Sequence, residues 1–243
     1  MKTFQDSGFV LKALPAGELN KHIVLLLKEH GKVVVTAKGA MNPKSKLYAA
    51  TQPFSCCEFK IYRGSGFLSL AEGNVLESFY NLSMDYDRYD TACHILKLVD
   101  TMIQPEMPAR AALVLLYKGF KLLLEGKDCK LVRAVFELKI MQSEGYVPVV
   151  NACAECGDNE IALGNHSKDE KKFTDNIIFA ATGLLCENCA ANKRAAKISA
   201  KTLQAINYIL DAKYKDSFAF SASDKIIEEL SDAAMVMLNE NIF

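Results

Sequence analysis

The chain has 243 residues, of which 50% are hydrophobic and 24% are charged, and its 29 basic side chains balance its 29 acidic ones. This composition excludes a disordered chain, because half of the residues can enter an apolar core. The N-terminus has no hydrophobic signal region, and the longest aliphatic run, 23–27, is too short to span a bilayer. We therefore expect a cytoplasmic protein, in which eight cysteines indicate metal binding rather than disulfides.

The net charge of zero conceals a gradient along the chain. Residues 1–80 carry ten basic and six acidic side chains, residues 81–150 carry nine of each, and residues 151–243 carry ten basic and fourteen acidic ones. A basic N-terminal third is compatible with a polyanionic partner, but an excess of four charges is modest. Charge by itself therefore favours nucleic-acid binding only slightly.

The first part of the chain has the pattern of five short strands. Segments rich in β-branched and aromatic residues alternate with turns that contain glycine or proline. Five short strands favour a small closed barrel, because closure removes exposed sheet edges, and an OB-fold barrel and an SH3-like barrel fit equally well at this level. The predicted strands span Phe4 to Leu14, Asn20 to Leu27, Lys32 to Ala37, Pro53 to Tyr62 and Phe67 to Ala71.

The remaining chain has apolar residues at helical spacing, interrupted by one region without a clear period. We expect an α+β protein with a barrel domain at 1–78 and a helical domain at 79–243. Residues 146–192 keep neither a strand period nor a helix period, as expected of loops organised by a metal ion. The predicted helices lie around 92–103, 112–123, 131–141, 202–213 and 223–238.

Two C-x-x-C knuckles, Cys153 with Cys156 and Cys186 with Cys189, are separated by 29 residues. Two residues between the cysteines let both thiolates converge on one tetrahedral ion at about 2.3 Å, and two knuckles fill all four positions. The sequence therefore predicts one structural zinc ion per chain, with no open coordination position for a substrate.

Two other interpretations of the knuckles are an iron–sulfur cluster and two independent redox or buried cysteine pairs. A redox pair usually lies at the strand-to-helix junction of a βαβ unit, and the sequence shows none. His166 lies between the knuckles and could replace a cysteine ligand, although a solvent-exposed loop position is the simpler interpretation. The other four cysteines are expected to pack as small hydrophobic residues.

The motifs of several enzyme classes are missing from the sequence. A nucleotide kinase needs G-x-x-x-x-G-K, and a zinc deaminase needs H-x-E with P-C-x-x-C; neither pattern occurs. The four histidines have no serine or cysteine nucleophile in a recognisable context. We therefore expect a binding protein rather than an enzyme.

A lysine-rich turn, with Lys38, Lys44 and Lys46 within nine residues, follows the third predicted strand. Lysines on an exposed turn of a basic barrel can neutralise phosphates without reading bases. A turn that lysines merely keep solvated is the alternative.

Short motifs distributed along nearly the whole chain form a recognisable order. They are Gly17-Glu18-Leu19-Asn20-Lys21, Lys38-Gly39-Ala40, Pro43-Lys44-Ser45-Lys46, Arg133-Ala-Val-Phe136-Glu137-Leu138 and Gly145-Tyr146-Val147-Pro148, followed by the two knuckles. In this order and spacing, the chain resembles the RecO family of recombination mediators.

The resemblance implies an N-terminal OB fold, a helical domain with an inserted four-cysteine zinc module at about 146–192, and no catalytic activity. It further implies a nucleoid-associated protein that binds and anneals single-stranded DNA, with double-stranded DNA as a second candidate partner. Such a mediator helps to load recombinase onto DNA coated by single-strand binding protein, together with RecR. The family often has basic residues where this chain has Met41-Asn42, so DNA contacts in the turn fall to the three lysines. A zinc-ribbon scaffold that binds only protein is the alternative.

A candidate contact for the tail of single-strand binding protein is Arg133 beside Phe136. That tail is an acidic peptide with a hydrophobic end, which needs a cation next to an apolar pocket. Alternatively, Arg133 forms an ordinary pair with Glu137 at i, i+4.

Overall fold

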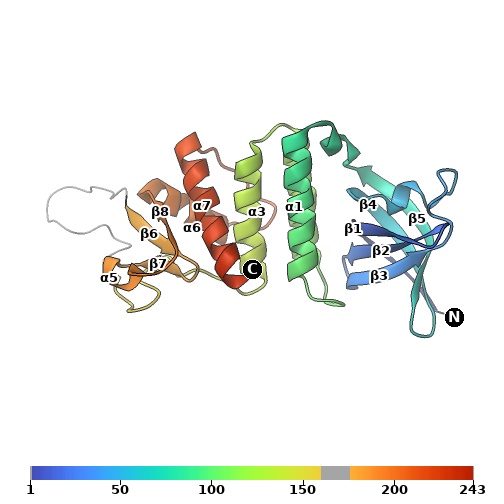
Figure 1. Cartoon of the computed structure of the whole chain (residues 1–243), viewed down its shortest axis with the longest axis horizontal. Helices are drawn as coiled ribbons and strands as arrows, with labels where there is room; N and C mark the ends of the chain where they lie inside the picture. Colours follow the sequence, from blue (N-terminus) through green and yellow to red (C-terminus); the bar gives the residue numbers. More distant parts are fainter. Residues whose placement is uncertain (1, 160–175, 243) are drawn as a thin grey trace. The chain divides into compact units, whose positions relative to one another are not determined.

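The computed structural model describes residues 2–159 and 176–242, and the chain forms two compact units, Met1–Gly126 and Lys127–Phe243. The first unit contains a barrel followed by two long helices, and the second contains helices and a small sheet (Figure 1). The last barrel strand ends at Ser78, at the domain boundary expected from the sequence, but the two helices that follow group with the barrel.

Five strands close the barrel in the order β1-β2-β3-β5-β4. β1 pairs antiparallel with both β2 and β4, and β3 meets β5 in parallel at Thr36 and Ser69. This is the five-stranded barrel of an OB fold, and it confirms the predicted α+β class with an N-terminal barrel. The strands are β1 (Lys2–Ala16), β2 (Asn20–Leu27), β3 (Gly31–Ala37), β4 (Ser55–Arg63) and β5 (Leu68–Ser78), and the 3₁₀ helix η1 (Ala49–Thr51) lies between β3 and β4.

The barrel interior is filled by side chains that alternate along the strands. On β2, for example, Ile23, Leu25 and Leu27 are fully buried and belong to one apolar cluster. Alternation of this kind turns one face of each strand inward, which explains why the strand period was visible in the sequence. The barrel core consists of Val10, Ile23, Leu25, Leu27, Val33, Val35, Ala37, Ala40, Ala50, Cys57, Phe59, Ile61 and Leu70.

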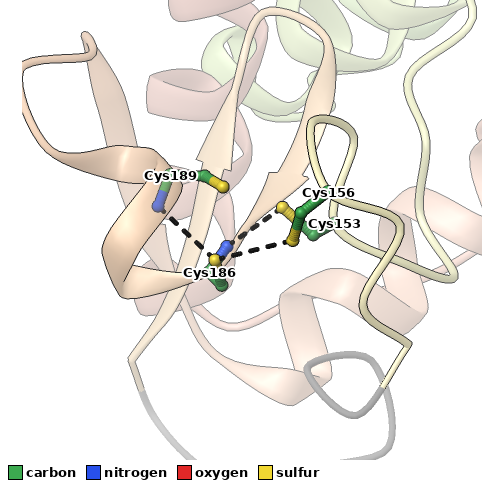
Figure 2. Close-up of side chains that lie close together, drawn as sticks. All are labelled: Cys153, Cys156, Cys186 and Cys189. Atoms are coloured by element: carbon green, nitrogen blue, oxygen red, sulfur yellow. Dashed lines mark hydrogen bonds between the residues drawn. The ribbon is translucent and has the colours of Figure 1, made fainter.

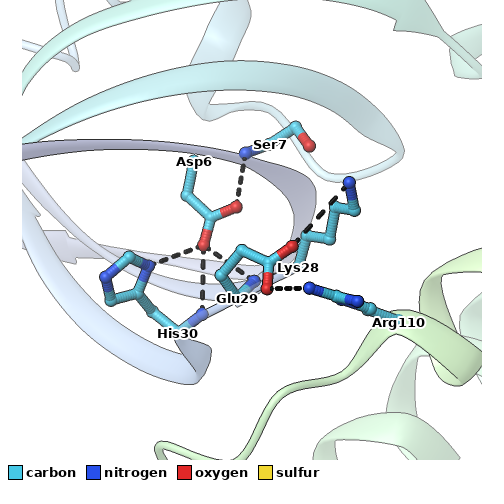
Figure 3. Close-up of polar contacts among 6 residues, drawn as sticks. All are labelled: Asp6, Ser7, Lys28, Glu29, His30 and Arg110. Carbon is cyan, nitrogen blue, oxygen red and sulfur yellow. Dashed lines mark hydrogen bonds and ion pairs between the residues drawn. The ribbon is translucent and has the colours of Figure 1, made fainter.

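The buried carboxylate of Asp6 holds the turn between β2 and β3 against β1 (Figure 3). It accepts hydrogen bonds from the backbone N–H groups of Ser7 at 2.8 Å and of Glu29 and His30 at 3.0 Å each. The Nδ1 atom of His30 lies 2.7 Å from the same carboxylate. Gly31 completes the turn with φ 67°, and a Cβ atom there would meet the Met107 carbonyl oxygen at 2.1 Å.

Two helices complete the first unit after the short 3₁₀ helix η2 (Tyr80–Met84). α1 (Tyr86–Met102) begins at Asp85, whose side chain accepts a hydrogen bond from the Arg88 N–H at 3.0 Å. α2 (Arg110–Leu124) is closed by Gly126, with φ 82°. Both helices confirm the predicted ones, and no helix in the described ranges is long and apolar enough to cross a membrane.

The second unit contains the three remaining predicted helices and a sheet that the sequence did not predict. α3 buries almost its whole length, from Leu131 to Met141. The sheet is antiparallel with the order β7-β6-β8, and its strands of three and four residues are too short to show a period. The elements are α3 (Cys129–Ser143), β6 (Ile177–Ala180), β7 (Gly183–Leu185), α5 (Glu187–Ala190), β8 (Ala195–Ile198), α6 (Ala200–Asp211) and α7 (Asp224–Asn241).

Candidate metal centre and candidate nucleic-acid interface

The first cysteine knuckle is held by the edge of β7. Backbone hydrogen bonds join Val149 to Thr182 and Leu184, and join the Ala154 N–H to the Leu184 carbonyl at 2.8 Å. This close approach requires Gly183, because a Cβ atom there would lie 2.1 Å from the Val149 carbonyl oxygen. The knuckle turns back at Gly157, which has φ 78° and donates its N–H to the Cys153 carbonyl at 2.9 Å.

The second knuckle lies where β7 meets the short helix α5, and it brings its thiols to those of the first (Figure 2). The sulfur atoms of Cys153, Cys156, Cys186 and Cys189 all lie within 4.8 Å of one another. The Cys156 and Cys186 sulfurs are 3.9 Å apart. Four zinc–sulfur bonds of about 2.3 Å in a tetrahedron require sulfurs about 3.8 Å apart. The geometry therefore fits a single four-coordinate metal ion.

Backbone N–H groups also point at the sulfurs. The Cys186 N–H donates to the Cys153 sulfur at 3.5 Å, and the Cys189 N–H donates to the Cys186 sulfur at 3.4 Å. Such hydrogen bonds orient the ligands and stabilise thiolate charge around a metal.

Hydrogen bonds within the cluster shift the pKa values of two thiols in opposite directions. Burial raises the pKa of Cys153, but backbone N–H groups of Cys156, Cys186 and Glu155 outweigh burial and lower this pKa to about 6. Hydrogen bonding to Cys186 raises the pKa of Cys189 to about 12. A divalent ion would displace the remaining protons.

The donor set limits which ion the cluster could hold. Four thiolates are soft ligands that select zinc or an iron–sulfur cluster over magnesium or calcium. All four positions are taken by protein, so the arrangement suits a structural role. His166, the other candidate ligand, lies outside the described residues.

The predicted DNA-binding lysines, Lys38, Lys44 and Lys46, lie on a turn that is ordered by hydrogen bonds. The Gly39 N–H donates to the Asn20 side chain at 2.9 Å, and the Lys44 N–H donates to the Asn42 side chain, also at 2.9 Å. The Asn42 side chain therefore shapes the turn that presents Lys44. All three lysine side chains are exposed.

Among the described residues, several other lysines of the first unit have carboxylate partners, unlike the lysines of the turn. Lys28 pairs with Glu29 at 3.8 Å, and Lys60 pairs with Glu72 at 2.8 Å. Within the described parts of the chain, none of the three turn lysines has an ion pair. Their charges are therefore available to an external anion.

A buried lysine below this turn was not singled out from the sequence. Lys21 is 8% exposed, its Nζ atom lies 4.9 Å from the centre of the Tyr48 ring, and it donates to the Thr51 hydroxyl at 3.4 Å. Burial lowers its pKa. The strand pattern could have predicted this burial, because alternation along β2 turns Lys21 to the same side as the buried Ile23, where η1 covers it.

The residues predicted to bind the protein tail lie on α3. Phe136 is fully buried, and Arg133 donates to Glu137 at 2.8 Å, which is the i, i+4 pair given above as the alternative. Tail binding at Arg133 stays a prediction, and Phe136 is not accessible in this conformation.

Two family profiles match the chain and together cover nearly all of it. The profile described as Recombination protein O N terminal matches residues 1–79, and that described as Recombination protein O C terminal matches residues 83–242.

Individual relatives with the name DNA repair protein RecO give the same result. The protein from Acetivibrio thermocellus is 31% identical over 245 aligned residues, which cover 100% of this chain and 93% of the relative. The protein from Shouchella clausii is 30% identical over 209 residues, covering 84% and 77%. That from Caldicellulosiruptor bescii is 31% identical over 189 residues, covering 78% and 73%.

Proposed function

The chain belongs to the RecO family of DNA repair proteins, and from this premise we propose that it is a recombination mediator that binds and anneals single-stranded DNA. The family is named for DNA repair and not for a catalysed reaction. The observation that carries the proposal is the ordered turn with three exposed lysines that have no carboxylate partner among the described residues. An OB-fold barrel with such a turn is suited to contact phosphates with little sequence preference.

The proposed DNA contact is electrostatic, so its salt dependence tests it. Each phosphate neutralised on a single strand contributes about −0.7 to the slope of log affinity against log salt, so three lysines predict a slope near −2. Replacing Lys38, Lys44 and Lys46 with alanine should flatten this slope and weaken binding to random sequences equally.

A matched control changes net charge by the same amount within the first unit. Lys28, Lys60 and Lys121 each have a glutamate partner, so replacing them with alanine should leave the salt slope close to that of the parent. If both triple variants lose affinity alike, general charge and not the lysine turn determines binding. If the parent does not bind single-stranded DNA at low salt, the alternative of a protein-binding zinc-ribbon scaffold replaces this proposal.

We propose that the cysteine cluster holds one structural zinc ion. The sulfur geometry, the closed coordination and the N–H groups directed at the thiolates support zinc. Metal analysis of protein purified under reducing conditions should give about one zinc per chain. A visible absorption band with iron would identify an iron–sulfur cluster instead.

The proposed partners are RecR and the C-terminal tail of single-strand binding protein, in the cytoplasm at the nucleoid. Because Phe136 is buried, the tail contact has to rest on Arg133. Co-purification with intact and tail-deleted single-strand binding protein tests the partner. Arg133→Gln tests the residue, with Lys130→Gln on the same helix as control; equal tail affinity of all three proteins would assign Arg133 to the Glu137 pair alone.

A further inference from the structure

A groove of about 810 Å³ lies within the first unit, apart from the lysine turn. Its walls are the second half of β1, the segment that precedes β4, η2 and the side of α1. Leu14, Pro53 and Leu96 give it an apolar lining. The groove is an independent feature, because nothing in the metal centre or the lysine turn requires it.

A β-bulge in β1 creates one wall of the groove. The pairing of β1 with β2 shifts register between Val10 and Lys12, which makes Leu11 the extra residue. Val10 belongs to the barrel core and does not line the groove, whereas the next two residues, Leu11 and Lys12, both line it. Without the bulge, strict alternation would turn Lys12 towards the barrel interior. The bulge thus places a cation beside an apolar surface.

Aromatic rings line the opposite side. The Tyr89 ring meets the Phe54 ring edge-on, with centroids 5.8 Å apart, and Phe54 is a buried residue with the unusual φ of 66°. Tyr80 is 60% exposed, and no aromatic ring of the described residues is stacked on it. A non-glycine residue held in the left-handed region often marks a site where backbone strain serves binding. The groove therefore presents aromatic surface that is open to a flat ligand.

The charges around the groove favour an anion. Lys12 on β1 and Lys97 on α1 line it, and neither has an ion pair in the portion of the chain described. Asp100 is the one carboxylate among its described lining residues, and it is paired with Lys32 at 3.6 Å. Two free cations on separate walls can contact successive phosphates along a strand.

The chain segment that follows the lysine turn forms part of one groove wall. The segment leads through η1 to Gln52, which lines the groove and donates from its side-chain amide to the Tyr48 carbonyl at 3.0 Å.

We propose that this groove binds unpaired bases of single-stranded nucleic acid, which stack on Tyr80, while Lys12 and Lys97 contact the flanking phosphates. The proposal rests on the proposed DNA-binding function and adds a base-binding site to it. Exposed tyrosine rings bind any base through its flat face, so the site is tolerant of sequence. An acidic peptide is the rival occupant, but it would leave the exposed ring of Tyr80 without a role.

The experiment compares oligodeoxythymidine with an abasic strand of the same length, at one salt concentration. Stacking of a base on an aromatic ring predicts that Tyr80→Ala weakens oligodeoxythymidine binding at least about fivefold and leaves abasic binding unchanged. Tyr80→Phe keeps the ring and should behave as the parent. Tyr86→Ala is the control. Tyr86 is the first residue of α1 and is 81% exposed, but it does not line the groove.

Three results would overturn the groove as a base site. Tyr80→Ala could bind both strands like the parent, or lose both equally. Tyr80→Ala could also lose affinity for an acidic peptide that ends in phenylalanine while it keeps the oligonucleotide, which would make the groove a peptide site. In each case, a flattened salt slope in the lysine-turn variant would leave the proposed DNA-binding function intact. Absence of any strand binding by the parent would reject both.

Discussion

The barrel and the cysteine module each contain a β-sheet, but we expect them to be stabilised in different ways. The barrel closes on itself and encloses thirteen buried residues. In the described part of the module, the apolar cluster at the knuckles has three buried residues, Cys153, Ala180 and Leu185, and one of them is a candidate metal ligand. The rest of the three-stranded sheet also buries apolar side chains, but the knuckles themselves have little apolar core. We therefore expect the barrel to depend on apolar burial and the knuckles to depend on the proposed ion.

Removal of the metal should have the largest effect, and only in the module. Binding of structural zinc contributes about 10–16 kcal/mol in zinc-finger peptides, and this binding energy is folding energy. Chelation under reducing conditions, or Cys186→Ser, should therefore abolish amide-exchange protection in β6 and β7 and leave β1 to β5 protected. Cys56→Ser, in the barrel and outside the cluster, is the control and should keep its metal. An unchanged exchange pattern after metal loss would contradict the comparison.

Truncating a side chain in the barrel core should destabilise the barrel and leave the metal content unchanged. Phe59 is 1% exposed in the centre of the core, so Phe59→Ala should lower the free energy of unfolding by about 3–5 kcal/mol through lost contacts and a cavity. Denaturant titration measures this change, and metal content should stay that of the parent. Glu58→Ala, exposed on the same strand, should change stability by less than about 0.5 kcal/mol. Loss of metal in Phe59→Ala would show that the two regions are coupled.

Replacing Asp6, which holds the turn shown in Figure 3, should destabilise the barrel by a smaller amount. Asp6→Ala removes the acceptor of three backbone N–H groups, and because these hydrogen bonds are only partly buried, each loss should cost about 1 kcal/mol, the lower end of the range for an unsatisfied donor, or about 3 kcal/mol in all. Asp6→Asn keeps one acceptor oxygen and should lose less. Glu18→Ala, exposed in the turn after β1, is the control. Equal midpoints for Asp6→Ala and the parent would mean that water replaces the carboxylate.

The same contrast explains how much of the fold the sequence could predict. All five barrel strands were located because each shows alternation, and β2 was predicted to the residue, but β5 was predicted only as far as Ala71 and extends to Ser78. The bulge at Leu11 was not predictable, because it depends on the register with β2. The strands of the module were missed for lack of length. The OB topology came from the family resemblance and not from the strand pattern.

The candidate sites, like the fold, were predictable from the sequence only in part. Two knuckles 29 residues apart predicted a four-cysteine cluster, because ligand spacing within each knuckle is local. Which lysines are paired was not predictable, since the partners are distant in sequence: Lys60 meets Glu72, and Lys32 meets Asp100. The groove beside α1 is formed by segments from three parts of the first unit, so no local motif marks it.

The junction between the module and the helices of the second unit gives the smallest expected effect. β8 ends at Ile198, and α6 begins directly after Ser199. The Glu229 carboxylate on α7 accepts hydrogen bonds from the N–H and the hydroxyl of Ser199 at 2.7 Å each, and from the Thr202 hydroxyl. Burial raises the pKa of Glu229, but these hydrogen bonds outweigh burial and lower it below the usual value. The junction is therefore held by an ionised carboxylate.

The pH dependence of stability tests this carboxylate. Its pKa is lower in the folded state than the value of about 4.3 in the unfolded chain, so its contribution is complete above that pH and disappears as the pH falls through the folded-state pKa. Glu229→Gln should thus be less stable than the parent by about 1.5 kcal/mol at pH 7, the scale of a hydrogen bond to a charged group. The two proteins should converge in acid.

Glu228→Gln is the matched control for this change, because Glu228 is exposed and pairs only at the surface with Lys130. Its effect should stay below about 1 kcal/mol and decrease with added salt. Amide exchange of β8 locates the effect. Exchange should increase in Glu229→Gln at pH 7 while the proposed metal stays bound. The reason is that the metal would hold the knuckles, whereas the carboxylate holds the end of the sheet. Loss of metal together with β8 protection would show that the ion does not stabilise the module independently of the helices.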